Sequence, residues 1–463
     1  MANLEELKEK LLSNPKTAYE VMTEEECAES LKFAQEYMEF MDAAKTEREA
    51  VTVVAAMAEK NGFKPYKLGD SIVKGGKYYY NNRDKSIYLF VIGSENIENG
   101  MRISAAHIDS PRVDLKQCPL YEDSNIAYFK THYYGGIKKY QWTAIPLALH
   151  GVVTKKDGTT VTITIGEDPA DPVLYISDLL PHLGAKQMGM TMSEGISGEQ
   201  LNLILGTKPY GNECKADAVK LNAMYYLYEK YGITEDDLLS AELCAVPAEK
   251  ARFVGFDKSL IGAYGHDDRV CSYPAAIAAF NAENPVHTVM TVLADKEETG
   301  SNGVSGMQCD VFTDLIRSIS DALGANDSIV RANSMCLSAD VNAAFDPNFP
   351  DVYEKRNASF VNRGVIMTKY TGARGKSGTS DASAEFVGKI RNMLDSNGVL
   401  WQTGELGKVD AGGGGTVAMY IANHNIDTVD LGVAVISMHA PYEVISTADL
   451  YMTKRAFEVF FKD

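Results

Sequence analysis

The chain has 463 residues, of which 45% are hydrophobic and 23% are charged, and its formal net charge at pH 7 is -18. This mixture is typical of a globular protein with a sizeable core, and the length allows two domains. The negative charge argues against nucleic acid and against an anionic membrane surface as the main partner, because both would repel the chain at long range.

The cysteines and the first residues indicate the cellular compartment. Seven cysteines are scattered along the chain without any C-x-x-C pair, which predicts reduced thiols: Cys27, Cys118, Cys214, Cys244, Cys271, Cys309 and Cys336. The first 15 residues have the pattern of an acidic amphipathic helix without the apolar core of a secretory signal, and no later stretch is apolar for long enough to span a bilayer. We therefore expect a cytoplasmic protein.

The predicted elements begin with helices. Apolar residues recur at helical spacing from Cys27 to about Asn61, and the first strand is expected at residues 86–93. From about Pro111 to Val246 the sequence favours β-structure, including a hairpin that turns at Asp157-Gly158.

After Val246, apolar strands alternate with amphipathic helices as far as a last helix over residues 446–461. This pattern is typical of an α/β fold, here with a mixed sheet, and it resumes the pattern seen before residue 111. We therefore predict a discontinuous catalytic domain, residues 1–110 and 247–463, into which a β-rich domain is inserted, residues 111–246.

Five short polar clusters end apolar runs, where an α/β sheet presents its ligands. The first contains His107 and Asp109; an imidazole can bind a metal while the carboxylate orients it, although such a pair alone is more often structural. The second contains Asp267 and Asp268 at a predicted helix start, where carboxylates are also good caps.

The third cluster ends an apolar strand in Glu297 and Glu298, of which one could bind metal while the other acts as a general base. Adjacent side chains of a strand point to opposite faces, so this division requires the backbone to turn, and Thr299 to Gly303 supply a turn. The last two clusters each offer one ligand, Asp340 and His439. Together the clusters predict a site for two divalent ions with nitrogen and oxygen ligands.

Several motifs are long enough to be specific: HIDSPR, HDDR, KEETGS, SADVNAAFDPN followed by NRG, GGGGT and MHAPYE. In this order and over nearly the full chain, the sequence resembles the aspartyl aminopeptidase family of dinuclear zinc exopeptidases, in its bacterial aminopeptidase 1-like branch. The resemblance implies a zinc-exopeptidase fold and removal of single residues from the free amino ends of peptides.

The resemblance also implies a role for each candidate. His107 and Asp340 would hold one ion, Glu298 and His439 the other, and Asp267 would bridge them, since the family places its bridging aspartate first. Asp109 would orient His107, and Glu297 would be the general base. The ions are expected to be Zn²⁺, with Co²⁺ or Mn²⁺ as alternatives that the same ligands accept.

Candidates for binding the substrate are Gly413, Gly414, Thr416 and Lys369, because a glycine run lets backbone amides approach a ligand and a lysine can neutralise an acidic side chain. The glycine run is equally explained as a turn before a helix, and a surface lysine is usually a solvated charge. Relatives that prefer acidic substrates carry an Asp-Arg-Asp run where this chain has residues 140–146, and a second histidine where it has Lys186.

The resemblance further implies a homo-oligomer, a hollow tetrahedral dodecamer built through the inserted domain. The alternatives left open are an aminopeptidase of broad or neutral specificity, a carboxypeptidase or deacylase that uses Arg269 or Arg374 against a substrate carboxylate, and a silent assembly protein on the same fold. The intact set of five ligand positions argues against the last.

Overall fold

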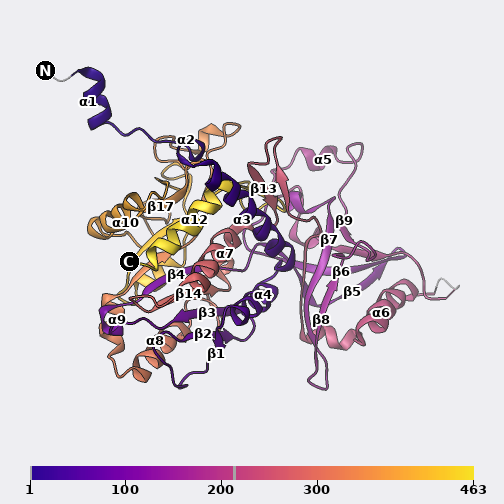
Figure 1. The fold of residues 1–463 in the computed structure, drawn as a ribbon. Coiled ribbons are helices and arrows are strands. Elements are labelled where there is room, and N and C mark those ends of the chain that lie inside the picture. Colours follow the sequence, from indigo (N-terminus) through magenta and orange to yellow (C-terminus); the bar gives the residue numbers. More distant parts are fainter. Residues whose placement is uncertain (1–2, 212–214) are drawn as a thin grey trace.

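The fold was analysed in a computed structural model that describes residues 3–211 and 215–463. Two lobes lie side by side in Figure 1. The larger lobe carries both ends of the chain, and the smaller carries most of residues 111–246, here called the middle segment.

A nine-stranded sheet forms the centre of the larger lobe, and its strands come from both sides of the middle segment in the sequence. The pairs between β14, β4, β15 and β19 are parallel, whereas β3 with β14 and β17 with β19 are antiparallel, so the predicted mixed sheet is confirmed. In spatial order the strands are β1 (Lys64–Pro65), β2 (Lys77–Asn82), β3 (Ser86–Val91), β14 (Val289–Ala294), β4 (Arg102–His107), β15 (Met335–Ser338), β19 (Asp427–Gly432), β17 (Val365–Thr368) and β18 (Trp401–Thr403).

Helices cover both faces of this sheet, which is why its strands are apolar on both sides. In β3, Leu89 joins one buried cluster and Phe90, its neighbour, joins the other. The first cluster is covered by α3 (Glu24–Ala43), α4 (Glu47–Lys60), α7 (His266–Asn281), α10 (Ala384–Ser396) and α12 (Thr447–Phe460). The second is covered by α8 (Val311–Ala322), α9 (Asp327–Asn333) and α11 (Ala418–Ala422).

The middle segment forms a closed ring of strands around its own apolar core. Neighbours pair in the order β11-β5-β6-β10-β9-β7, and β7 pairs back with β11, while β8 adds to β7 outside the ring. The predicted hairpin at Asp157-Gly158 is the β7–β8 turn. The elements are β5 (Arg112–Asp123), β6 (Ile126–Tyr134), β7 (Pro146–Thr154), β8 (Thr160–Ile165), β9 (Leu174–Ile176), α5 (Ala185–Met188), β10 (Leu203–Gly206), α6 (Ala218–Tyr231) and β11 (Ala241–Pro247).

A third sheet of five strands lies beside α7 and α12. Its strands are β12 (Arg252–Val254), β13 (Leu260–Ala263), β21 (Glu443–Ser446), β20 (Ala434–Ile436) and β16 (Asn342–Ala343). It matters for the site because α7 follows β13 and His439 follows β20 closely in the chain.

Charged side chains join the two lobes where α3 and α4 meet the middle segment. The Lys45 ammonium lies 2.6 Å from a Glu167 carboxylate oxygen, and Nδ1 of His150 lies 2.7 Å from Glu49. Arg112 of β5 donates to Glu47 of α4 at 2.6 Å. Because these groups are largely buried and paired across the junction, separating the lobes would leave charges without partners.

Two short helices precede α3. These are α1 (Leu4–Leu11), which projects from the larger lobe and buries no side chain, and α2 (Ala18–Val21). Among the described residues, none of the helices is both long and apolar enough to cross a membrane.

Some expectations were wrong in detail. The strands begin at β1 and β2, ahead of residues 86–93, because Lys77–Asn82 pairs with β3 although its sequence, KYYYNN, is only half apolar. The six cysteines that the structure describes form no disulfide with one another, Cys214 lies outside the described residues, and the reduced state stays a prediction. The boundaries 110/111 and 246/247 stay predictions.

Candidate metal centre

Three of the five polar clusters meet at one edge of the large sheet. Strands β14, β4 and β15 are parallel neighbours, so their carboxyl ends lie together. His107 is the last residue of β4, Glu297 and Glu298 follow β14, and Asp340 follows β15. At this edge, ligand atoms of His107 lie within 4.8 Å of those of Asp340 and of Glu298.

The other two clusters reach the same place from the five-stranded sheet. Asp267 stands in the first turn of α7, just after β13, and has non-helical backbone angles there. His439 follows β20 and has a positive φ of 65°. Both loops thus turn their side chains toward the ends of β4 and β14.

The five candidate ligands fall into two groups that share Asp267. One Asp267 oxygen lies 3.1 Å from Nε2 of His107, and the other lies 3.1 Å from Nε2 of His439. Asp340 approaches His107 to 3.9 Å, and Glu298 approaches His439 to 3.6 Å. Each group therefore offers one imidazole, one terminal carboxylate and one oxygen of the shared carboxylate.

The paired glutamates lie in a turn, where their side chains do not alternate between opposite faces as they would in a strand. Glu297–Thr299 form one 3-10 turn between Lys296 and Gly300, both of which have left-handed backbone angles. The Asp109 carboxylate accepts the backbone N–H groups of Glu297 at 3.1 Å and of Glu298 at 3.2 Å. Asp109 is completely buried, and Nδ1 of His107 lies 3.0 Å from its backbone carbonyl and 3.3 Å from its carboxylate. One residue therefore contacts both the imidazole and the turn.

The site concentrates negative charge away from water. Burial, and then the charge of Asp267, raises the pKa of Glu298 well above its ordinary value, and burial likewise raises the pKa of Asp340. Burial and the charges of Asp109 and Asp267 raise the pKa of Glu297 to about 7, although His107 opposes this. Ionising these acids together is costly unless cations share the site.

The donor set fits divalent metal ions. Histidine nitrogen and carboxylate oxygen are zinc ligands, and ligand atoms of His107, Asp267 and Glu298 lie within 4.8 Å of one another. Among the described residues, Oε1 of Glu298 is buried and accepts no hydrogen bond. A buried carboxylate oxygen that accepts no hydrogen bond is free to bind a cation.

Asp268 lies beside the site in a different environment. It is completely buried, one of its oxygens accepts the backbone N–H of His107 at 3.4 Å, and the other has no partner among the described residues. Its ligand atoms also come within 4.8 Å of those of His107 and Asp340. Asp267, however, is the aspartate that lies between the two histidines.

Three supporting groups were not identified from the sequence. Glu443 accepts the backbone N–H groups of Asp267 at 3.0 Å and of His439 at 2.6 Å. Tyr134 donates to Asp109 at 2.7 Å, and the Gly136 carbonyl lies 2.7 Å from Nδ1 of His439. Glu443 is the last residue of the MHAPYE motif, so the sequence could have identified it. Tyr134 and Gly136 belong to the middle segment and lie in no motif that indicates their contacts with the site.

The proposed substrate contacts lie near one another but are engaged within the protein. Gly413 packs against Gly372 and Ala373, and the Gly414 carbonyl accepts the N–H of Gly372. Thr416 donates to Asp430 at 3.1 Å, and Lys369 forms an ion pair with Asp381. Their part in substrate binding stays a prediction.

The two arginines of the carboxypeptidase alternative differ in their surroundings. Arg269 is completely buried and donates to the backbone carbonyls of Gly265 and Lys45. The hydrogen bonds of Arg269 are therefore made within the protein. Of the two arginines, only the exposed Arg374 could still bind a substrate carboxylate, as the carboxypeptidase alternative requires.

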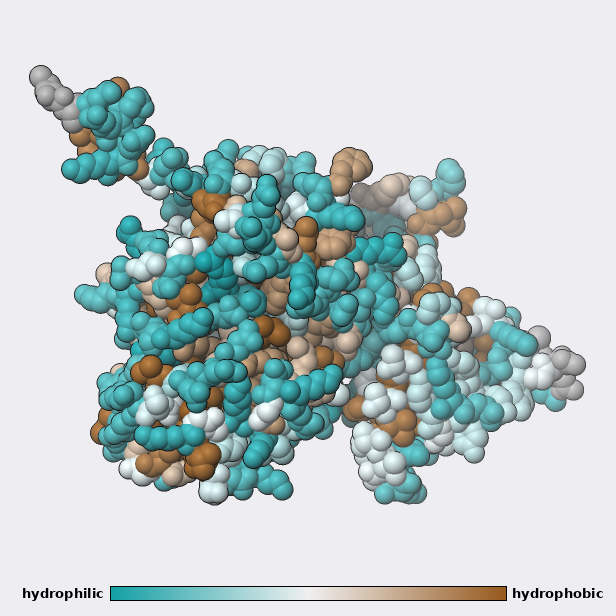
Figure 2. Space-filling view, in the orientation of Figure 1, coloured by the Kyte–Doolittle hydropathy of each residue, from teal (hydrophilic) through white to brown (hydrophobic). Residues whose placement is uncertain are grey.

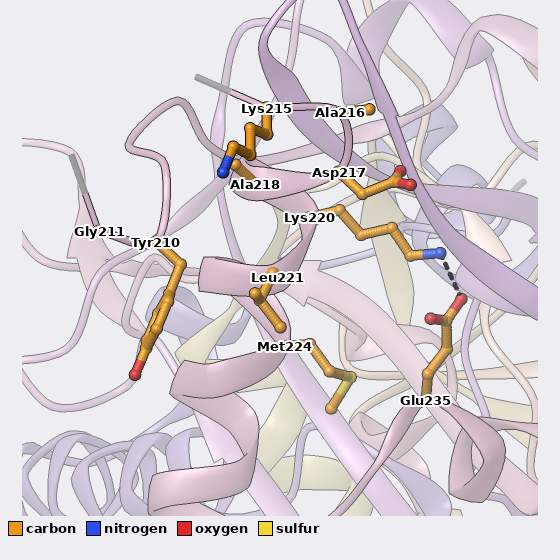
Figure 3. Close-up of a pocket in the computed structure, with 10 residues that line it drawn as sticks. All are labelled: Tyr210, Gly211, Lys215, Ala216, Asp217, Ala218, Lys220, Leu221, Met224 and Glu235. Carbon is orange, nitrogen blue, oxygen red and sulfur yellow. Dashed lines mark ion pairs between the residues drawn. The ribbon is translucent and has the colours of Figure 1, made fainter. Parts of the chain in front are cut away.

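A separate hollow of about 800 Å³ lies in the middle segment (Figure 3). Its lining includes Tyr210, Leu221, Met224 and the ion pair of Lys220 with Glu235, 2.8 Å apart. None of the candidate metal ligands lines it, so it is not the predicted site.

Comparisons with known proteins identify the family of this chain. The sequence profile of a family described as aminopeptidase I zinc metalloprotease (M18) matches residues 40–461. A probable M18 family aminopeptidase 1 from Clostridium acetobutylicum is 46% identical over 97% of this chain and 98% of its own length. Its counterpart from Thermotoga maritima is 47% identical over 92% of this chain and 94% of its own length. The crystal structure of an M18 family aminopeptidase from Thermotoga maritima is similar with a TM-score of 0.93 and 45% identity, over 97% of this chain and 99% of that one. The chain therefore belongs to the M18 family of aminopeptidase I zinc metalloproteases, which are hydrolases acting on peptides.

Proposed function

We propose that this protein is a cytoplasmic aminopeptidase that holds two zinc ions and releases the first residue of short peptides. The observation that carries the proposal is the position of Asp267, 3.1 Å from both His107 and His439. A carboxylate shared by two imidazoles, each with its own acidic neighbour, is the arrangement that two adjacent ions need.

The five proposed ligands form the two groups described above. His107 and Asp340 would hold one ion, His439 and Glu298 would hold the other, and Asp267 would be shared by both. Bound there, the ions supply positive charge that polarises the scissile carbonyl and makes the attacking water more acidic. Asp109 keeps the His107 ring and the Glu297–Glu298 turn in place.

Glu297 carries the proton transfer. Its carboxylate takes a proton from the attacking water as the new C–O bond forms, and it returns that proton to the leaving amine as the C–N bond breaks.

The acids beside the proposed ions can receive the amino end of a peptide. The carboxylates of Glu297 and Asp340 can accept hydrogen bonds from a free α-amino group. Arg269, one of the two arginines that might have received a carboxylate, is buried and bound to backbone carbonyls. Both points support an aminopeptidase over a carboxypeptidase.

The preferred side chain is proposed as Asp or Glu, with a neutral or broad preference as the second candidate. Lys369 is the group proposed to receive an acidic side chain, next to a loop that contacts Gly413 and Gly414. The ion pair of Lys369 with Asp381 favours the second candidate, because the lysine charge is already neutralised.

We also propose assembly into a dodecamer through the middle segment. Leu179, Leu183, Met188 and Met192 are exposed there, and Figure 2 shows hydrophobic atoms around α5. Apolar side chains gathered on one surface are typical of an interface. A yeast dodecamer shares the fold with a TM-score of 0.76, but at 23% identity this likeness reaches no further than the fold.

The test is a substrate panel. Zinc-loaded protein and a Glu297→Gln control are assayed on anilides of Asp, Glu, Leu and Lys, on their amino-blocked forms, and on peptides blocked only at the carboxyl end. Cleavage that requires a free amino end and Glu297 supports the proposal, and preference for Asp and Glu supports the acidic specificity. Cleavage of amino-blocked substrates would contradict the aminopeptidase assignment.

Specificity is tested by a matched pair of lysine variants. Lys369 and Lys376 both pair with Asp381. If Lys369 receives acidic side chains, Lys369→Met raises KM for Asp and Glu anilides and leaves Leu anilide unchanged, while Lys376→Met changes neither. Equal effects of the two variants on all substrates would support neutral specificity.

A further inference from the structure

Strand β6 of the middle segment ends beside the candidate metal centre. Its last residue is Tyr134, followed by Gly135 and Gly136, and all three belong to the middle segment although every proposed ligand belongs to the larger lobe. The Tyr134 hydroxyl donates to Asp109, and the Gly136 carbonyl faces Nδ1 of His439, each over 2.7 Å.

These contacts reach both candidate histidines. The Asp109 backbone carbonyl lies 3.0 Å from Nδ1 of His107 and the Asp109 carboxylate lies 3.3 Å from it, so Tyr134 acts on His107 by holding Asp109 in place. Gly136 acts on His439 directly. In both cases the contact is made on the Nδ1 side, which leaves Nε2 facing Asp267. A partner on one ring nitrogen fixes the tautomer and direction of the other, which is how outer groups tune a metal-binding histidine.

The segment is itself held firmly against the larger lobe. The Arg112 guanidinium lies 4.3 Å from the centre of the Tyr134 ring and is bound to Glu47 of α4. Burial raises the pKa of the Tyr134 hydroxyl, so the group keeps the proton that it donates to Asp109.

Gly135 permits this close approach. Its φ is +71°, and a Cβ at this position would lie 3.2 Å from a carboxylate oxygen of Glu298. A residue with a side chain would be strained in this conformation and would crowd a proposed ligand. The glycine therefore lets the backbone of the middle segment run directly beside the site.

We propose that Tyr134 and the Gly136 carbonyl are positioning groups that the middle segment supplies to both metal-binding histidines, so that zinc affinity depends on the docking of this segment. The inference rests on the proposed two-zinc function and extends it. Neither group touches the reacting atoms.

The experiment compares two neighbouring tyrosines. Tyr134→Phe removes only the hydroxyl that bonds Asp109, and the control is Tyr133→Phe on the opposite face of β6, where Tyr133 is exposed and its ring contacts His132. Each metal-free protein is titrated with zinc against a competing chelator. We expect Tyr134→Phe to lower zinc affinity by about 10- to 100-fold and Tyr133→Phe to leave it unchanged.

A second readout separates positioning from folding. Melting curves of the metal-free proteins should be nearly the same, while saturating zinc should raise the melting temperature of Tyr134→Phe less than that of wild type. The titration is made below the lowest transition, so a less stable variant is still compared in its folded state.

The outcomes distinguish this inference from the function on which it rests. Equal zinc affinities in wild type and Tyr134→Phe would overturn the inference alone. Wild-type protein that binds no zinc would overturn the proposed metal centre and the inference with it.

Discussion

The larger lobe and the middle segment differ in how they contribute to the site. The larger lobe supplies every proposed ligand from the ends of strands or from the turns that follow them, and each ligand type stands out in the sequence. The middle segment supplies one hydroxyl and one backbone carbonyl at the end of β6. Candidate ligands at strand ends can therefore be proposed from sequence, whereas support from a second lobe depends on how the lobes pack.

The largest change in activity is expected from a substitution in the larger lobe. Glu297→Gln should lower kcat by about 10²- to 10⁴-fold, because the amide cannot take the proton of water. The turn should survive, since Asp109 is bonded to the backbone N–H groups of Glu297 and Glu298 and not to the side chain. Steady-state kinetics and bound zinc are measured together. A variant that retains full kcat, or that is inactive only because zinc is lost, would contradict the role of Glu297.

A second comparison concerns the two cores. Phe312 lies in the core beneath the large sheet and Phe129 in the ring of the middle segment, each with a relative exposure of 1%. Phe→Ala at either position should lower the free energy of unfolding by about 3–5 kcal/mol. Because buried charges join the lobes, we expect calorimetry to show one transition that both variants lower. Two transitions, each moved by one variant, would mean that the lobes unfold independently.

A smaller effect on stability is expected when pH changes the charges at the junction of the two lobes. Although burial opposes it, the hydrogen bond from His150 and the charge of Lys45 lower the pKa of Glu167 from 4.5 to about 2. Despite burial, hydrogen bonds to Glu167 and Glu49 raise the pKa of His150 above 6.5. The ionised Glu167 carboxylate therefore adds to the free energy of unfolding above pH 4.5, and this stabilisation is lost as pH falls toward 2. The protonated His150 imidazole adds to the free energy of unfolding below pH 6.5, and that stabilisation is lost as pH rises through the pKa of His150 in the folded protein.

The measurement is the melting temperature of wild type and Glu167→Gln across this range. The difference between them should be greatest between about pH 4.5 and 6.5 and should narrow on both sides. A difference that does not vary with pH would show that Glu167 stabilises the junction by packing and not by charge.

The sequence was enough to propose candidate ligands. His107, the Glu297–Glu298 pair, Asp340 and His439 stood out because each is a metal-binding residue type at the end of an apolar run, and the resemblance then chose Glu298 as the ligand of the pair. The choice of Asp267 over Asp268 came from family resemblance, and only the packed structure places its two oxygens beside the two histidines.

Other features lacked a local signal. Strand β17 has four residues between turns, and β2 is a half-apolar run whose strand state depends on pairing with β3. Tyr134 is one of several tyrosines in β5 and β6, and nothing in its neighbours indicates that it reaches Asp109. Such contacts between residues far apart in the chain arise from tertiary packing, which periodicity does not encode.

The most direct test of the central claim is anomalous diffraction at the zinc absorption edge from crystals grown with zinc. We predict two peaks in each chain, one between His107 and Asp340 and one between His439 and Glu298, with the Asp267 carboxylate bridging them. A single peak, or peaks that Asp267 does not contact, would contradict the two-ion centre.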